Sequence, residues 1–148
     1  MLKTNAMRFV SPFVVLALCT ALIPGASAAD SDSKSTPYGT MNAYLSIGYD
    51  DQHGVDVTAF LQTDIDSSVT MKKITHKIEA QYQDTGATIR SNTYTFNNTN
   101  DTGLTFWDVS LDQSKLDSGI AVYSTHQVLY TNAYVIYLVD TLPSYWDT

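Results

Sequence analysis

The sequence predicts an all-β protein, built as an antiparallel sandwich of two sheets with about seven strands. Apolar and polar residues alternate with a period of two in several successive runs, which is typical of strands with one buried face. The chain of 148 residues contains ten tyrosines and 15 acidic residues, of which only Glu79 is a glutamate. Tyrosine favours strands, and aspartate favours turns over helices, so the composition indicates strands joined by polar turns.

The alternation defines the strands in order. The first carries Met41 and Ile47 on one face and polar residues on the other. The run 69–82 changes phase at Lys72-Lys73, which we interpret as a β-bulge that keeps apolar residues on the core side. The predicted strands are 41–49, 55–63, 69–82, 87–96, 104–111, 120–130 and 132–140.

Two of these runs predict a position within their sheet. The run 87–96 is the most polar, which is typical of an edge strand. The run 132–140 is apolar on both faces, so we expect a central strand that is covered on both sides. Trp107, in the run 104–111, is expected to point inward.

Residues 1–28 have the features of a secretory signal peptide. A basic start and an apolar run are followed by the breaker Pro24-Gly25 and by small residues that end at Ala28. We therefore expect cleavage after Ala28 and a secreted chain with no membrane span. In that chain 29–39 is a flexible lead-in and 40–148 forms a single β-sandwich domain.

Cleavage would change both the charge and the cysteine content. Lys3 and Arg8 leave with the leader, so the net charge goes from −7 to −9. A chain this acidic argues against binding nucleic acid, whose affinity comes from neutralising phosphates with Lys and Arg. The only cysteine, Cys19, also leaves. The mature domain is then free of disulfides, and its core must supply its stability.

One segment is similar to a known structural element. LDSGIAVY, at Leu116–Tyr123, resembles the tyrosine corner that precedes strand F of immunoglobulin-type domains. The resemblance covers eight residues, and the spacing from Asp to Tyr is two residues longer than usual. It implies an Ig-like arrangement of the sandwich.

The stretch YDDQHGVD, at Tyr49–Asp56, gathers acids, a histidine and a glycine between two alternating runs. Its position predicts a hairpin connection, for which these residue types are ordinary. A zinc site needs three or four converging ligands, and His53 has no histidine or cysteine near it in the sequence. We therefore expect no zinc, and no cofactor other than calcium.

Calcium is the open alternative, because it takes oxygen ligands from loops. No DxDxDG spacing with a distal glutamate is present, so solvated loop acids are the competing interpretation. The candidate calcium ligands are Asp50, Asp51, Asp56, Asp64 and Asp66.

Aromatic residues provide the main candidate for a binding surface. Tyr44 and Phe60 lie on the polar faces of their strands, and pairing of those strands would place them side by side on an outer face. Such platforms stack on sugar rings or anchor protein partners, although cross-strand packing is the structural alternative. Polar loops add further candidates. The candidate binding residues are Tyr44, Phe60, Asp50, Asp51, His53, Asn98 and Asn100.

The sequence favours a secreted protein with a non-catalytic role, which binds a protein partner or a glycan at the cell exterior. A calcium-stabilised extracellular structural module is the alternative, and a small secreted hydrolase is favoured least. The chain has neither a GxSxG elbow nor a phosphate-binding glycine loop, so we expect no enzyme. Asn97 and Asn100 begin glycosylation sequons, whose use depends on the source.

Overall fold

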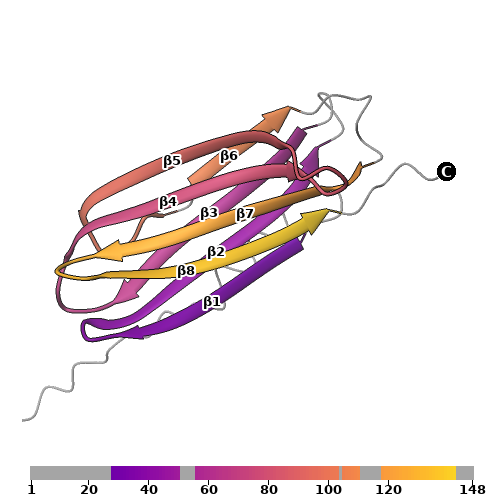
Figure 1. Cartoon of the computed structure of the whole chain (residues 1–148). Coiled ribbons are helices and arrows are strands. Elements are labelled where there is room, and N and C mark those ends of the chain that lie inside the picture. The colour runs from indigo at the N-terminus through magenta and orange to yellow at the C-terminus, as the bar shows by residue number, and fades with distance from the viewer. Residues whose placement is uncertain (1–27, 51–55, 104, 111–117, 143–148) are drawn as a thin grey trace, which may run out of the picture.

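The computed structural model describes residues 28–50, 56–103, 105–110 and 118–142. The predicted signal peptide therefore lies almost entirely outside the described residues. No helix in these ranges is long and apolar enough to cross a membrane. The strands are β1 (Ala28–Thr36), β2 (Gly39–Asp50), β3 (Asp56–Asp66), β4 (Met71–Tyr82), β5 (Thr88–Thr99), β6 (Thr105–Ser110), β7 (Ile120–Leu129) and β8 (Ala133–Leu142) (Figure 1).

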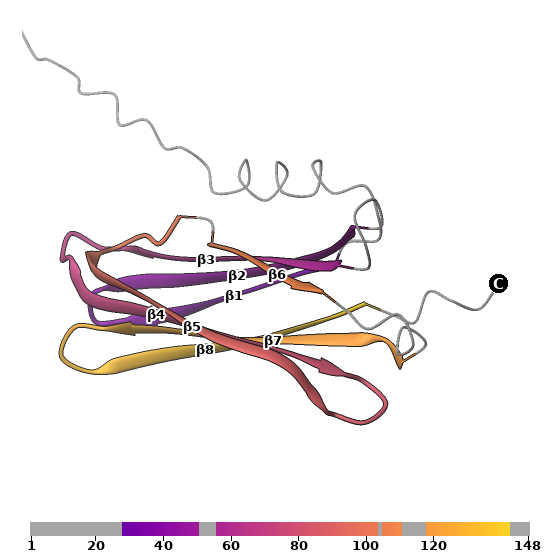
Figure 2. The same ribbon diagram turned by 90° about the horizontal axis from the view of Figure 1, so that it is seen from above.

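The strands form two antiparallel sheets that pack face to face, which confirms the predicted all-β sandwich (Figure 2). Sheet A has the order β1-β2-β3-β6, and sheet B has the order β5-β4-β7-β8. The described residues thus contain eight strands rather than about seven.

The strand order is Ig-like, as the sequence predicted. The chain crosses from sheet A to sheet B after β3, returns for β6 and crosses again before β7. Strands β2, β3 and β6 thereby occupy the positions A, B and E of an immunoglobulin-type sandwich, and β4, β7 and β8 occupy C, F and G. Tyr123 does fall on the F-position strand, but its side chain is 44% exposed and faces outward.

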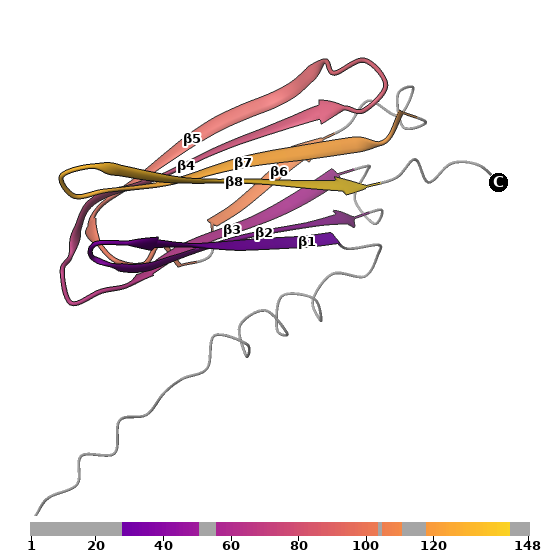
Figure 3. The same ribbon diagram turned by 60° about the horizontal axis from the view of Figure 1, so that its bottom comes forward.

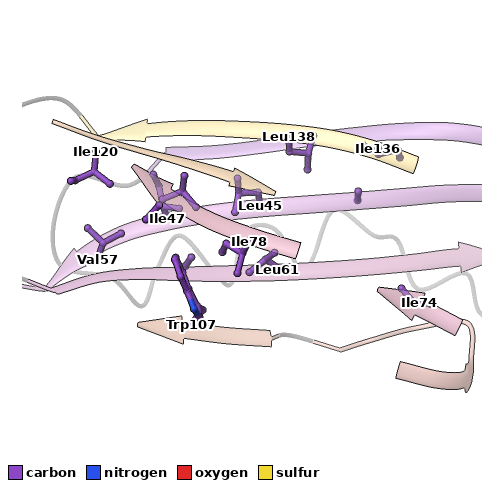
Figure 4. Close-up of a cluster of buried hydrophobic side chains, with 14 of the residues drawn as sticks. Leu45, Ile47, Val57, Leu61, Ile74, Ile78, Trp107, Ile120, Ile136 and Leu138 are labelled. Carbon is purple, nitrogen blue, oxygen red and sulfur yellow. The ribbon is translucent and has the colours of Figure 1, made fainter. Parts of the chain in front are cut away.

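The core lies between the sheets and is built from the period-two positions of both. Inward residues such as Leu45, Leu61 and Ile78 are fully buried (Figure 4). Trp107 points inward as predicted and is 2% exposed. This apolar layer provides the main driving force for folding, because the described residues contain no cysteine that could cross-link them.

Strand β1 corrects the predicted boundaries, because residues 29–39 were expected to be a flexible lead-in. Ala28–Thr36 instead pairs along its whole length with β2. The inward positions of β1 are occupied by Asp30, Asp32 and Lys34, opposite Leu45, Ala43 and Met41. The strand therefore forms by backbone pairing without an apolar face, which is why the alternation rule did not detect it.

Of the two predicted strand positions, the edge position of 87–96 is confirmed and the central position of 132–140 is not. Strand β5 lies at an edge of sheet B, as expected. Strand β8 lies at the opposite edge of the same sheet, so the prediction of a central strand was wrong. Strand β1 lies beside β8 at this side of the sandwich (Figures 1 and 3), and the Lys34 ammonium donates to the backbone carbonyl of Val135 at 3.2 Å.

The predicted bulge at Lys72-Lys73 was also wrong. Strand β4 keeps one register with β5 from Met71 to Ala80, and the register shift lies between Ala80 and Gln81. Met71 and Ile74 are nevertheless both buried, as the prediction required.

Candidate functional site

Three large apolar side chains are exposed in the described part of the chain, and all three lie together. Tyr137 is 76% exposed, Val139 is 47% exposed and Tyr123 is 44% exposed. Tyr123 pairs with Val139 across β7 and β8, and Tyr137 lies two residues from Val139 on the same face. We call these three residues the tyrosine patch. It covers part of the outer face of sheet B.

The patch results from the two-sided apolar pattern of β8 combined with its place at the sheet edge. The inward residues Ile136, Leu138 and Leu142 are buried in the core. The intervening residues must then point away from the core, because successive side chains alternate between faces. The opposite sheet covers only the inner face, so Tyr137 and Val139 remain in solvent.

Polar side chains lie beside the patch, toward β4. Thr125 lies directly opposite Tyr137 on β7. On β4, Lys77 and Glu79 lie next to Thr125 and Tyr123 and form an ion pair at 3.7 Å. The pKa of Glu79 is lowered, first by the hydrogen bond from Gln81. The surroundings therefore offer hydroxyl groups and a neutralised pair of charges rather than a net charge.

Other tyrosines pack within the structure. Tyr38 and Tyr130 make an edge-to-face contact with ring centroids 5.1 Å apart, and the Tyr38 hydroxyl bonds to Thr131. The Lys72 ammonium lies 5.4 Å from the centroid of the Tyr130 ring. These contacts join the β1–β2 turn to the β7–β8 turn. Some of the tyrosines therefore stabilise the fold, whereas the tyrosines of the patch are exposed to solvent.

The predicted pair Tyr44 and Phe60 lies on the outer face of sheet A. Tyr44 is paired with Gln62, and Phe60 with Ser46, so the two aromatic residues are diagonal neighbours. Both side chains are half-buried. The pKa of Tyr44 is raised, mainly by burial and also by the negative charge of Asp64. This pair offers less accessible ring surface than the patch.

The structure separates the acids that were proposed to bind one calcium ion. Asp50 pairs with Asp56 at one end of the β2–β3 hairpin, while Asp64 and Asp66 lie toward the other end of β3. Asp56 and Asp66 are ten residues apart on one strand, a span of about 33 Å, so these two positions lie too far apart to share an ion. The described residues contain no group of three or more His, Cys, Asp or Glu that could hold a metal. Asp51 and His53 lie outside the described residues.

The two candidate asparagines differ in environment. Asn98 is exposed and has a positive φ of 53°. Asn100 is held at both ends, because its Oδ1 accepts from the Met71 amide at 2.8 Å and its Nδ2 donates to the Ser67 carbonyl at 2.9 Å. Asn100 therefore holds the start of β4 in place.

A buried polar cluster joins the two sheets. The Oγ1 of Thr63, on sheet A, lies 2.7 Å from Nε2 of His76 and 2.6 Å from Nδ1 of His126, both on sheet B. Nε2 of His126 lies 2.9 Å from the Ser124 hydroxyl. Thr63 and both histidines are completely buried, and Ser124 is 2% exposed. We call these four residues the histidine cluster. His76 and His126 are directly paired across β4 and β7.

The hydrogen-bond partners determine how the cluster shares its protons. Nδ1 of His76 is buried and has no partner, and an unpaired acceptor costs less than an unpaired donor. His76 then donates from Nε2 to Thr63, Thr63 donates to Nδ1 of His126, and His126 donates from Nε2 to Ser124. Each of these three contacts thus has one donor and one acceptor.

Burial keeps both imidazoles neutral. It lowers the pKa of His76 to about 4. The pKa of His126 is lowered to about 3, by burial first and then by the neighbouring His76. The cluster has the hydroxyl and imidazole groups of a nucleophilic site, but complete burial leaves Thr63 no access to a substrate. Its role in the described structure is to connect the sheets.

Asp140 is a second buried polar group, near the C-terminal end of β8. Its Oδ1 accepts from the Thr141 amide at 2.9 Å, whereas its Oδ2 has no partner. The pKa of Asp140 is raised to about 6, mainly by burial and also by the negative charge of Asp30.

Comparisons with known proteins identify no relative. No protein-family model matches the chain, and no curated protein or solved structure is similar enough to count as a match.

Proposed function

We propose that the chain is a secreted, non-catalytic binding protein that recognises a glycan through the tyrosine patch. The observation that carries this proposal is the 76% exposure of Tyr137, next to two other exposed apolar residues on the outer face of sheet B. Clustered exposed apolar side chains indicate a binding surface. The predicted signal peptide supports a place of action outside the cell.

The size and chemistry of the patch favour a sugar over a protein. A standard protein interface buries about 800 Å² on each partner and uses about 20–30 residues a side. The patch offers three apolar side chains. Tyrosine rings present an apolar face for stacking, and the hydroxyl of Thr125 stands where it could bond a sugar hydroxyl. The Lys77–Glu79 ion pair leaves no net charge beside the patch, which suits a neutral sugar.

Binding to a panel of immobilised oligosaccharides tests the proposal. The unmodified protein should bind a subset of the panel, and Tyr137→Ala should weaken that binding by about tenfold or more, which corresponds to about 1.4 kcal/mol. Tyr137→Phe keeps the ring and should retain most of the affinity.

Tyr44→Ala is the matched control, because it removes the same side chain from the other outer face. It should leave glycan binding within about twofold, equivalent to about 0.4 kcal/mol. If Tyr44→Ala abolishes binding and Tyr137→Ala does not, the binding surface is on sheet A. If no oligosaccharide binds while the patch captures a protein, the partner class is wrong.

A further inference from the structure

The outer face of sheet B continues from the tyrosine patch to the opposite edge of the sheet, where β5 lies (Figure 1). The register pairs Tyr137 of β8 with Thr125 of β7. It pairs Thr125 with Lys77 of β4, which is paired in turn with Thr93 of β5. Directly paired residues point to the same face, so these four side chains form one row across the sheet. We call them the crossing row.

The polar groups of the crossing row are available to a ligand. Tyr137, Lys77 and Thr93 are exposed, and Thr125 is half-buried. Neither threonine hydroxyl bonds to another residue in the part of the chain that the structure describes. Each hydroxyl can donate one hydrogen bond and accept others. The row therefore extends the ring of Tyr137 with groups that suit sugar hydroxyls.

The length of the row indicates a ligand of several sugars. Neighbouring strands are about 4.8 Å apart, so Tyr137 and Thr93 are separated by about 14 Å across the sheet. This exceeds the width of a single sugar ring. Adjacent strands are also rotated by about 20–25° relative to each other, so the ligand must bend to follow the row. Rings joined by rotatable glycosidic bonds meet both requirements.

The ends of the row favour an internal segment of a chain over a terminal sugar. Both ends lie at edges of sheet B, because β8 and β5 are its outermost strands. A bound chain can therefore continue past Tyr137 and past Thr93. Recognition of a terminal sugar would instead need side chains of this face that enclose the end of the ligand.

The charges beside the row favour a neutral ligand. Lys77 forms an ion pair with Glu79 at 3.7 Å. Lys73 lies four residues away along β4, level with Leu129 rather than with the row. The protein has a net charge of −7, so an anionic polymer would be repelled by most of its surface.

We propose that the protein binds an internal segment of a neutral, linear polysaccharide, which lies across sheet B from Tyr137 to Thr93. This inference rests on the proposed function, and it adds the form of the ligand and the rest of the crossing row to the site. Tyr137 stacks on one ring, and Thr125, Lys77 and Thr93 bond to hydroxyls of the sugars that follow.

Isothermal calorimetry with oligosaccharides of increasing length tests the proposal. The probes are neutral linear oligomers of glucose, xylose, mannose and N-acetylglucosamine, each as a ladder from disaccharide to hexasaccharide. In a ladder that binds, affinity should rise with each added sugar until the row is covered. The total rise should be about tenfold or more, because further hydrogen bonds form along the row.

Thr93→Val separates the far end of the row from the tyrosine patch. It should weaken binding of the hexasaccharide by about fivefold and leave the disaccharide unchanged, because the shorter ligand stays at Tyr137. Thr141→Val is the matched control. It removes the same hydroxyl from an exposed position of β8 that is paired with Ala121, off the row, and should leave both affinities unchanged. Circular dichroism establishes that both variants are folded.

The inference is overturned if the disaccharide binds as tightly as the hexasaccharide, or if Thr93→Val changes no affinity. A greater loss in Thr141→Val than in Thr93→Val would place the ligand along β8 and also contradict it. If only a branched or charged glycan binds and Tyr137→Ala abolishes that binding, the inference fails while the proposed function stands. If no glycan of any kind binds, both fail.

Discussion

Strand β7 separates two regions of opposite polarity. On its inner face, Ser124 and His126 belong to the fully buried histidine cluster, whereas on its outer face Tyr123 belongs to the exposed tyrosine patch. The polar groups are tolerated inside because they bond to one another across the sheets. The apolar groups outside have no such compensation within the described chain. The interior polar groups therefore stabilise the fold, whereas the exterior apolar surface is the feature on which the proposed binding function depends.

Removal of the shared hydroxyl should have the largest effect on stability. Thr63→Val keeps the side-chain shape but leaves Nε2 of His76 and Nδ1 of His126 without their partner. The loss should be about 2–5 kcal/mol of unfolding free energy, because both nitrogens stay buried. Thr95→Val makes the same change at an exposed position and should cost less than about 0.5 kcal/mol. Equal effects in denaturant titrations would show that the cluster contributes little.

Acidification should have the second-largest effect, because it lowers the stability that depends on the neutral histidine cluster. The folded pKa values of His76 and His126, about 4 and about 3, lie below the ordinary value of 6.5. The unfolded chain therefore binds protons first, and stability present above about pH 6.5 is lost as the pH falls. Each histidine contributes a slope of up to about 1.4 kcal/mol per pH unit. Unfolding curves whose midpoint does not change between neutral pH and pH 4.5 would contradict this.

Asp140 should change stability with pH in the opposite direction to the two histidines, and by less. Its folded pKa of about 6 lies above the ordinary 3.8, so the folded state holds this proton more tightly. The contribution of Asp140 to stability is present below the ordinary pKa and is lost as the pH rises through about 6. Asp140→Asn should therefore raise the melting temperature at about pH 8 more than at about pH 4.5. The exposed Asp66→Asn is the control, and a gain at acid pH only would refute the assignment.

Glycosylation at the two sequons should have the smallest effect on stability. The two asparagines differ, because one is exposed and the other is hydrogen-bonded. Asn97 is exposed, whereas both ends of the Asn100 amide are bonded. Expression in a glycosylating host should add one glycan, at Asn97, with little change in melting temperature. Peptide mass spectrometry locates the glycan. Modification at Asn100 would show that the glycan is added before the two hydrogen bonds of this side chain form.

The alternation rule predicted the fold because it reports which face of a strand meets the core. It identified seven of the eight strands, the inward Trp107 and the polar edge β5. It missed β1, whose inward residues are charged and which is held by pairing with β2. A local pattern contains no information about such pairing.

The candidate site was harder to predict for the same reason. The rule interpreted the two apolar faces of β8 as two buried faces, although one of them is the exposed patch. Tyr44 and Phe60 were correctly placed as outer-face neighbours, but parity could not give their half-burial. The calcium set stays a prediction, and its weakness is that Asp56 and Asp66, close in the sequence, lie at opposite ends of one long strand.

The proposed function requires that the outward residues of β7 and β8 form the binding surface. Chemical-shift mapping of the isotope-labelled protein, titrated with the oligosaccharide it binds best, tests this most directly. Saturable shifts are expected at Tyr123, Tyr137 and Val139, while Tyr44 and Phe60 should not respond. Shifts confined to sheet A or to the loops, with the patch unchanged, would contradict it.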